Sequence, residues 1–312
     1  MNTEPPENPT SFFARWWTYQ RERFPLVGHG LLIAAFSFCA VSYSHRLRTG
    51  AVAFPLGAAL LVAYVTCFLF FLQLRIADEF KDFEEDSKFR PYRPVPRGLV
   101  SLRALGILFV LAALIQLAAG LWLAPRLGLL LLLPWIYLAA MSKEFWARDW
   151  LVARPITYMW THMLIMPLVD FYATGCDWLA IGAQPPSGLG WFLAASLGNG
   201  VVFEIGRKLR APMDEEEGVR TYTALWGIPT ATTAWLGALL VTGFCAWQAA
   251  RAIGFGAAVA GILGAIFVLA VLHKIIFCRA PEPDQGKPFE GISGLWTLAM
   301  YLSLGGLQYL FW

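Results

Sequence analysis

Hydrophobic residues along this chain form long runs that are separated by short polar segments. Nine of these runs approach the roughly 20 residues that cross a bilayer as an α-helix. They cover residues 26–44, 54–77, 100–123, 127–143, 155–174, 189–208, 225–248, 255–277 and 291–311. The pattern predicts an all-α, polytopic membrane protein with nine transmembrane helices, whose two ends lie on opposite sides of the membrane.

The N-terminal 24 residues follow a different pattern. Residues 1–10 are rich in Pro, Glu and Asn and predict a disordered tail, whereas residues 11–24 interleave aromatic and Arg side chains, as in an amphipathic helix on a membrane surface. No signal-peptide pattern precedes the first hydrophobic run, so we expect that run to stay in the mature protein. The predicted organisation is a tail with an interfacial helix over 1–24 and a single transmembrane domain over 25–312.

The distribution of Lys and Arg predicts the orientation. If the N-terminus is cytoplasmic, 20 of the 24 basic residues lie in cytoplasmic segments or at the cytoplasmic ends of spans. The four on the other side are Arg46, Arg48, Arg126 and Arg251. Because positive charge accumulates on the cytoplasmic side, we expect the N-terminus and the loop at residues 78–98 to be cytoplasmic.

Composition supports the membrane class: 58% of the residues are hydrophobic, 14% are charged, and the mean hydropathy is +0.56. A soluble domain carries more charge. The five cysteines are scattered through apolar runs without a C-x-x-C spacing, so they predict neither disulfides nor a zinc site. No nucleic-acid partner is expected.

A stripe of carboxylates follows the second hydrophobic run. Asp78, Asp82 and Asp86 recur every four residues, which places them on one face of a helix, about 6 Å apart along its axis. Like charges at this spacing repel each other by roughly 0.2–0.5 kcal/mol per pair in water, and by more near lipid. We therefore expect a cation beside them.

Oxygen ligands without nearby His or Cys suit a hard divalent ion, and Mg²⁺ is often shared between carboxylates and substrate phosphates. The stripe thus indicates a magnesium site and a phosphate ester as the substrate. The spacing alone leaves open an ordinary solvated helix end, since charged runs often serve only solubility.

The stripe leads into Arg93-Pro94-Val95-Pro96-Arg97-Gly98. Together the two segments resemble the first aspartate-rich motif of the UbiA-type membrane prenyltransferases, usually written N-D-x-x-D-x-x-x-D and followed by R-P-x-x-x-G. Asp78 stands where that family most often has Asn, and Glu79 where it has Asp. The family also has nine helices, so the resemblance covers nearly the whole chain. It implies a UbiA-like bundle with an active-site cavity that faces the cytoplasm.

A second charged segment, residues 204–221, leaves the sixth hydrophobic run on the same predicted side. In the family the equivalent loop carries a second acidic motif, D-x-x-D-x-x-x-D, which is followed by two glycines. Asp214, Gly218 and Gly227 match the last Asp and the glycines. Arg210 and Arg207 occupy the positions of the two earlier aspartates, so the second motif is half basic.

We interpret this segment as a diphosphate site in which fixed cations partly replace one magnesium, because an Arg fork binds phosphate oxygens without a metal. Glu204, one turn deeper, is a candidate metal ligand, since a carboxylate within a span normally faces a cavity. Two alternatives remain open. The basic cluster also suits attraction to anionic lipid headgroups, and Glu204 also suits a paired or snorkelling group at a helix end.

Lys143 stands where many family members have the Lys of a Y-x-x-x-K pattern. The Tyr position of that pattern is Ala139 here, and Tyr137 lies two residues too early. Aromatic residues within the spans could line an isoprenoid tunnel, although core packing is their more common use. His162 and Asn199 are possible acceptor contacts, with interhelical hydrogen bonds as the more common role.

The resemblance implies the transfer of an isoprenyl group from a prenyl diphosphate to an aromatic, quinone-like or other lipophilic acceptor within the bilayer. The residues assigned to Mg²⁺ are Asp78, Asp82, Asp86, Asp214 and Glu204, and those assigned to the diphosphate are Lys143, Arg207, Lys208, Arg210 and Arg93. Two other functions stay open: a terpene cyclase of the same superfamily, and a non-catalytic lipid-binding or transport protein that has kept the fold.

Overall fold

The computed structural model describes residues 9, 11–216 and 219–310, and within these residues the regular secondary structure is entirely helical. The predicted tail (1–10) is almost wholly outside the described residues, and so is Gly218. The long helices are α2 (Leu26–Thr49), α3 (Gly57–Lys81), α5 (Leu102–Leu123), α6 (Pro125–Ser142), α8 (Pro155–Met163), α9 (Ile165–Trp178), α10 (Leu189–Gly206), α12 (Ile228–Ala252), α13 (Gly256–Arg279) and α14 (Lys287–Tyr301).

Local sequence accounts for the helix ends. The Ser101 side chain accepts a hydrogen bond from the amide of Ala104 and caps α5. Pro125 occupies the first turn of α6, where its missing N–H costs nothing. Gly50 ends α2 in the left-handed region at φ 69°, a conformation that glycine adopts without strain. The polar loops of the sequence are therefore also the breaks between helices.

Eight helical segments in the described part of the chain are long and apolar enough to span a membrane, with α8 and α9 counting as one segment (Pro155–Ile181). They correspond to the first eight predicted spans, and the chain is an integral, multi-pass membrane protein. The predicted count of nine is not confirmed, because α14 has only 15 residues. It continues as a π-helical turn (η4, Leu302–Gly306) and a short 3₁₀ turn (η5, Leu307–Tyr309).

Close packing explains why the helix changes its winding after Tyr301. A Cβ atom at Gly305 would lie 2.3 Å from the Cα atom of Cys39 in α2, so only glycine allows this approach. Insertions of one residue into a helix commonly relieve such a local mismatch as a π-turn. The C-terminal segment thus packs directly against the backbone of α2.

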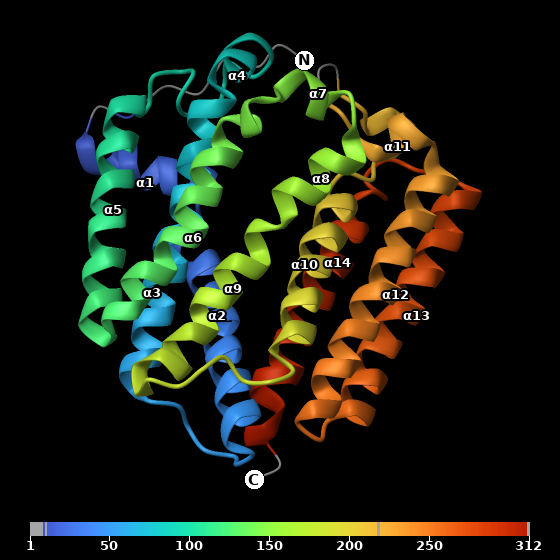
Figure 1. The fold of residues 1–312 in the computed structure, drawn as a ribbon. Helices are drawn as coiled ribbons and strands as arrows, with labels where there is room; N and C mark the ends of the chain where they lie inside the picture. Colours follow the sequence, from blue (N-terminus) through green and yellow to red (C-terminus); the bar gives the residue numbers. More distant parts are fainter. Residues whose placement is uncertain (1–8, 10, 217–218, 311–312) are drawn as a thin grey trace.

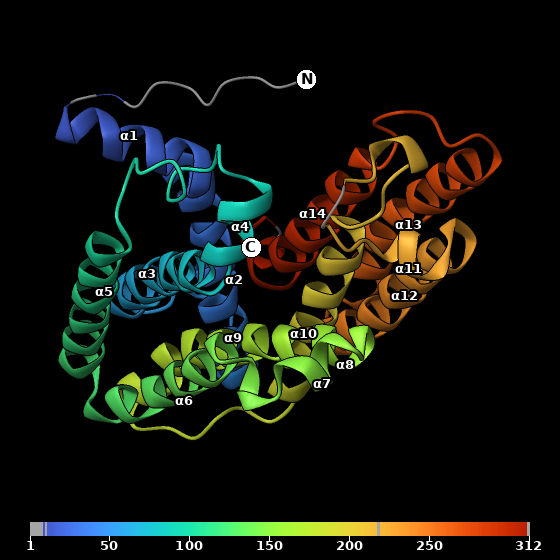
Figure 2. The same cartoon turned by 90° about the horizontal axis from the view of Figure 1, so that it is seen from above.

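The long helices run side by side as a bundle (Figure 1), and a view along the bundle shows α1 (Phe12–Arg23) lying across its axis (Figure 2). Phe12, Phe13 and Trp17 are exposed on α1. This is the position and the surface expected of an interfacial helix. The short helices α4 (Phe83–Phe89), α7 (Arg148–Val152) and α11 (Tyr222–Trp226) lie at one end of the bundle, and η5 lies at the other (Figure 1).

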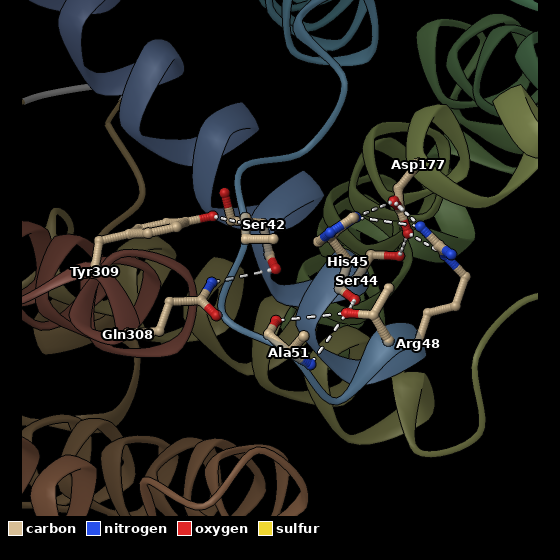
Figure 3. Close-up of polar contacts among 10 residues, drawn as sticks. Ser42, Ser44, His45, Arg48, Ala51, Asp177, Gln308 and Tyr309 are labelled. Atoms are coloured by element: carbon tan, nitrogen blue, oxygen red, sulfur yellow. Dashed lines mark hydrogen bonds and ion pairs between the residues drawn. The ribbon is translucent and has the colours of Figure 1, made fainter. Parts of the chain in front are cut away.

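A buried ion-pair network holds α2 to α9 (Figure 3), at the end of the bundle opposite to α4 and α11 (Figure 1). Asp177 accepts hydrogen bonds from Ser44 Oγ (3.0 Å) and from Arg48 Nε and Nη2 (3.1 and 2.9 Å), and its Oδ1 lies 3.1 Å from His45 Nδ1. All of these side chains are partly or fully buried. Because both carboxylate oxygens are fully used, we assign the network a structural role.

Candidate functional site

The acidic stripe is present in the structure, but the helix that carries it is interrupted. α3 ends at Lys81, α4 begins at Phe83, and Asp82 forms the junction. Asp is disfavoured within helices and favoured at their N-termini, which explains a break at this residue. Backbone hydrogen bonds from the Asp82 amide to the Asp78 carbonyl (2.9 Å) and from the Asp86 amide to the Asp82 carbonyl (2.8 Å) preserve the four-residue spacing across the junction.

Asp86 is already satisfied by the Arg-Pro segment that follows it. Its Oδ1 lies 2.9 Å from Arg90 Nη1 and its Oδ2 lies 2.6 Å from Arg93 Nη1, and the Asp86 residue is only 2% exposed. These ion pairs fold the 90–98 loop against the end of the stripe. The metal role of Asp86 and the diphosphate role of Arg93 stay predictions, and either role requires this buried pair to open.

Asp78 and Asp82 differ from Asp86, because neither side chain has a hydrogen-bond or ion-pair partner among the described residues. Burial raises the pKa of Asp82, and the nearby carboxylate of Asp78 adds to this effect against the opposing charge of Lys81. When Asp78 and Asp82 are both ionised, their negative charge is therefore not fully compensated by nearby positive charge. A hard cation would relieve this deficit.

The residues therefore fit Mg²⁺ at Asp78 and Asp82 but offer no complete protein cage. Within the described part of the chain, no cluster of three or more His, Cys, Asp or Glu side chains could hold a metal ion. Mg²⁺ commonly binds through one or two carboxylates together with substrate phosphates and waters, so two carboxylates suffice when a diphosphate supplies further oxygens.

Glu79, at the motif position where the resembled family has Asp, points into the protein instead. It is 2% exposed and lies 2.5 Å from Arg23 Nε and 3.1 Å from Arg75 Nη2. Arg23 belongs to α1, and Arg15 of the same helix donates hydrogen bonds to the carbonyl oxygens of Leu99 and Gly98. Glu79 therefore anchors the interfacial helix to the acidic segment.

The end of α10 carries the basic cluster. Glu204, 4% exposed, accepts hydrogen bonds from Arg207, one of them at 2.7 Å from Nε, and lies 2.5 Å from Lys208 Nζ. Lys208 Nζ also lies 5.7 Å from the ring centre of Tyr222 in α11. The cluster keeps one net positive charge. The metal role of Glu204 stays a prediction, and it requires these ion pairs to open.

Arg207 links the two charged segments across the bundle. Burial lowers the pKa of its guanidinium, but the carboxylates of Glu204 and Asp78 outweigh burial and raise it. Asp78 on α3 is thus close enough to act on the charge of Arg207 at the end of α10. The Arg207 side chain is still 46% exposed, so its guanidinium keeps a free edge. The exposed cation Arg207 is thus within electrostatic range of Asp78, which has no hydrogen-bond or ion-pair partner among the described residues.

Arg210 and Asp214 lie beside Arg207. All three line a cavity of about 480 Å³, together with Glu216, Asp284 and Lys287. Arg210 Nη1 is 3.5 Å from Glu216 Oε1, and Asp214 Oδ2 accepts a hydrogen bond from the Asp284 amide at 2.8 Å. No contact between described residues joins Asp214 to the first motif, so its metal role stays a prediction. The predicted cytoplasm-facing cavity is not confirmed.

Lys143 ends α6 as an exposed residue, and the chain then turns back toward the bundle. Glu144, Phe145 and Trp146 all adopt positive φ values, of 50°, 50° and 56°. Three consecutive non-glycine residues in this region are costly, and such strain is often found at functional sites. The turn buries the carboxylate of Glu144. The diphosphate role of Lys143 stays a prediction.

Glu144 joins a cluster that the sequence analysis missed. Its Oε1 accepts a hydrogen bond from the Tyr158 hydroxyl (2.8 Å) and lies 3.3 Å from Lys81 Nζ, while its Oε2 lies 3.1 Å from His162 Nε2. Burial raises the pKa of Glu144, but His162, Lys81 and Tyr158 outweigh it and lower the pKa to about 2. The signals in the sequence were Lys81 inside the acidic motif and His162 inside an apolar run.

Comparison with known proteins identifies the fold of the chain. No protein-family model matches the chain, and no curated protein matches it. Among solved structures, it is similar to an apo UbiA homolog from Aeropyrum pernix K1, with a TM-score of 0.65 and 16% identity over 90% of this chain and 97% of that one. A digeranylgeranylglyceryl phosphate synthase in membranes gives a TM-score of 0.58 and 11% identity over 93% and 97% of the two chains.

A UbiA homolog from Archaeoglobus fulgidus, bound to GPP and Mg²⁺, gives a TM-score of 0.53 and 14% identity over 92% of this chain and 98% of that one. The protein is thus a membrane protein of the all-helical class to which these structures belong. In particular, it has the UbiA-type fold, as the motif predicted.

Proposed function

We propose that the chain is an intramembrane, Mg²⁺-dependent prenyltransferase that moves an isoprenyl group from a prenyl diphosphate to a lipophilic acceptor. The observation that carries the proposal is that Asp78 and Asp82 have no hydrogen-bond or ion-pair partner among the described residues, while the charge of Asp78 acts on the exposed guanidinium of Arg207. Carboxylates that can hold a metal, together with a cation that can bind phosphate oxygens, suit a diphosphate. This combination is less typical of an ordinary solvated helix end. The similarity to a UbiA homolog bound to GPP and Mg²⁺ supports the same substrate class.

Asp78 and Asp82 would hold Mg²⁺, which when bound supplies positive charge to the diphosphate as it leaves. Arg207, supported by Lys208, would bind the remaining phosphate oxygens in charge-assisted hydrogen bonds. In the reaction the allylic C–O bond breaks and the diphosphate leaves with the electron pair. The acceptor forms the new bond to carbon and loses a proton.

The surroundings fit a reaction that must avoid water. The charged residues are at one end of a bundle whose spans are apolar, so the isoprenyl chain would extend into an apolar interior. We place this end in the cytoplasm, since the loops around α4, α7 and α11 share it and carry most of the basic residues. We propose that residues 25–312 form a single catalytic domain, a bundle of nine spans.

Incubation of the purified protein with prenyl diphosphates of several lengths, with and without Mg²⁺ and a lipid extract, tests the proposal. A transferase should release diphosphate in a Mg²⁺-dependent manner and form a product only when the extract is present. A cyclised hydrocarbon or alcohol without the extract would indicate a terpene cyclase. Binding without release would indicate a lipid-binding protein.

A further inference from the structure

One face of α10 leads from the charged end of the bundle into its interior. Ser196, Asn199, Phe203 and Arg207 are three or four residues apart, so they lie along a single face of the helix. Arg207 acts on Asp78 at the charged end, and Phe203, one turn deeper, is 40% exposed. Asn199 and Ser196, deeper still, are only 2% and 0% exposed. This face therefore changes from charged to aromatic to buried polar.

At the buried end, three helices converge on one hydroxyl. Tyr301 of α14 donates a hydrogen bond from its hydroxyl to Asp170 Oδ2 of α9 at 2.6 Å, and its hydroxyl oxygen lies 3.3 Å from Ser196 Oγ of α10. Asp170 is 0% exposed. Thr297 lies one turn before Tyr301 and Asn199 lies one turn after Ser196, so both are on the faces that meet here and nearer to the charged end.

Several polar atoms of this region have no hydrogen-bond partner among the residues that the structure describes. They are Asn199 Oδ1 and Nδ2, Asp170 Oδ1 and Thr297 Oγ1. In a membrane interior no solvent can satisfy such groups, so leaving them unpaired costs stability. Ionisable and polar residues that persist inside a span commonly mark a ligand pathway. The orphaned atoms therefore indicate a group that this protein binds.

The unpaired atoms also define the chemistry of that group. Asn199 Oδ1 and Asp170 Oδ1 require a donor, whereas Asn199 Nδ2 requires an acceptor. A hydroxyl provides both. An anionic group would face the carboxyl of Asp170, and an ammonium group would leave Asn199 Nδ2 unpaired. A neutral hydroxyl group on an otherwise apolar molecule fits best.

We propose that Asn199 and Asp170, positioned by Tyr301 and Ser196, form a subsite for the hydroxyl group of the lipophilic acceptor. This inference rests on the proposed function, because it names the acceptor class of the same reaction. Eight residues of helix separate Asn199 from Arg207, or about 12 Å along the axis. The subsite thus lies inward of the charged end, beyond the exposed ring of Phe203, so an acceptor bound there shares the interior with the isoprenyl chain.

The test compares 4-octylphenol with its methyl ether, which has the same apolar chain but lacks the hydroxyl donor. Affinity is measured by thermal shift on purified full-length protein in one detergent. Wild type should bind the phenol at least about tenfold more tightly than the ether, because the ether leaves a buried acceptor unpaired. Asn199→Leu should reduce this preference to about twofold or less.

Thr242→Val is the matched control. Thr242 is also 0% exposed, but its hydroxyl is satisfied by the Ala238 carbonyl at 2.7 Å. It packs at Gly198, about 200° around α10 from Ser196. The control should keep the wild-type preference for the phenol. Because each protein is scored by the ratio of two probes, partitioning into detergent affects all variants alike.

Equal binding of phenol and ether by wild type would overturn the subsite, even if Asn199→Leu fails to fold. A preference that survives Asn199→Leu would also overturn it. Geranyl diphosphate affinity, measured in the same samples, separates this inference from the proposed function. Diphosphate binding without phenol preference refutes only the subsite, whereas phenol preference without diphosphate binding supports the subsite and refutes the prenyltransferase proposal.

Discussion

Replacing Arg207 with Ala should weaken the binding of a prenyl diphosphate, whereas the same change at Arg210 should have little effect. The two residues line the same cavity, but their charged partners differ. Arg207 has an exposed guanidinium whose charge is affected by Asp78, whereas Arg210 Nη1 lies 3.5 Å from the carboxylate of Glu216. A charge-assisted hydrogen bond contributes about 1.5–3 kcal/mol, so affinity should fall roughly 10- to 150-fold for Arg207→Ala.

A second substitution, at Glu204, provides an independent test of the expected loss of diphosphate affinity. Without Arg207, the Glu204 carboxylate keeps only Lys208 as a partner, and the cluster loses its net positive charge. Adding Glu204→Gln to Arg207→Ala restores one net positive charge through Lys208. The double variant should therefore bind more tightly than Arg207→Ala alone, because it no longer exposes an extra carboxylate to the diphosphate.

The assay is isothermal titration with geranyl diphosphate at fixed Mg²⁺, for wild type, the two single Ala variants and the double variant. Arg210→Ala should stay within about twofold of wild type, as expected for an exposed ion pair. Wild-type affinity in Arg207→Ala, or an equal loss in Arg210→Ala, would refute the assignment of Arg207 to the diphosphate.

Three further predictions concern the residues that support the site. Because the pKa of Glu144 is lowered to about 2, its contribution to stability is complete above pH about 4.5 and is lost as the pH falls toward 2; Glu144→Gln should flatten thermal unfolding against pH in this window. Asp177→Asn should reduce stability by about 3 kcal/mol, because it leaves Arg48 partly buried and unpaired, yet diphosphate binding at the far end should not change; equal melting temperatures would contradict this. Glu79→Gln should release α1 and speed proteolysis within Phe12–Arg23, and unchanged cleavage would argue against the anchor.

Much of the fold follows from local sequence properties. Eight spans could be located because runs of apolar residues must be long enough to cross a bilayer as helices, although several helices continue a few residues beyond the apolar run. The last span differs because its geometry depends on a tertiary contact, the approach of Gly305 to Cys39, which no local pattern encodes. The break at Asp82 was equally invisible, since four-residue spacing persists across it.

The candidate site was predicted in part. Spacing and charge predicted the stripe of Asp78, Asp82 and Asp86. They could not predict that Asp86 is paired with Arg90 and Arg93, because these partners come from a loop that folds back. The position of Glu144 could not be predicted, because it depends on a backbone turn with positive φ. The motif resemblance pointed only to its neighbour in sequence, Lys143. Ion pairs between distant segments are a property of the folded chain.

The central claim is that Asp78 and Asp82 hold the metal that assists the departure of diphosphate. Its most direct test is the Mg²⁺-dependent release of diphosphate from geranyl diphosphate by wild type and by Asp82→Asn, with thermal unfolding measured on the same samples. Since Asp82 has no hydrogen-bond or ion-pair partner in the part of the chain that the structure describes, and since its pKa is raised, the substitution should preserve or slightly increase stability. We predict that the rate of diphosphate release falls at least about 100-fold in Asp82→Asn, as expected when a group that stabilises the transition state is removed. Release near the wild-type rate in a stable Asp82→Asn protein would contradict the account.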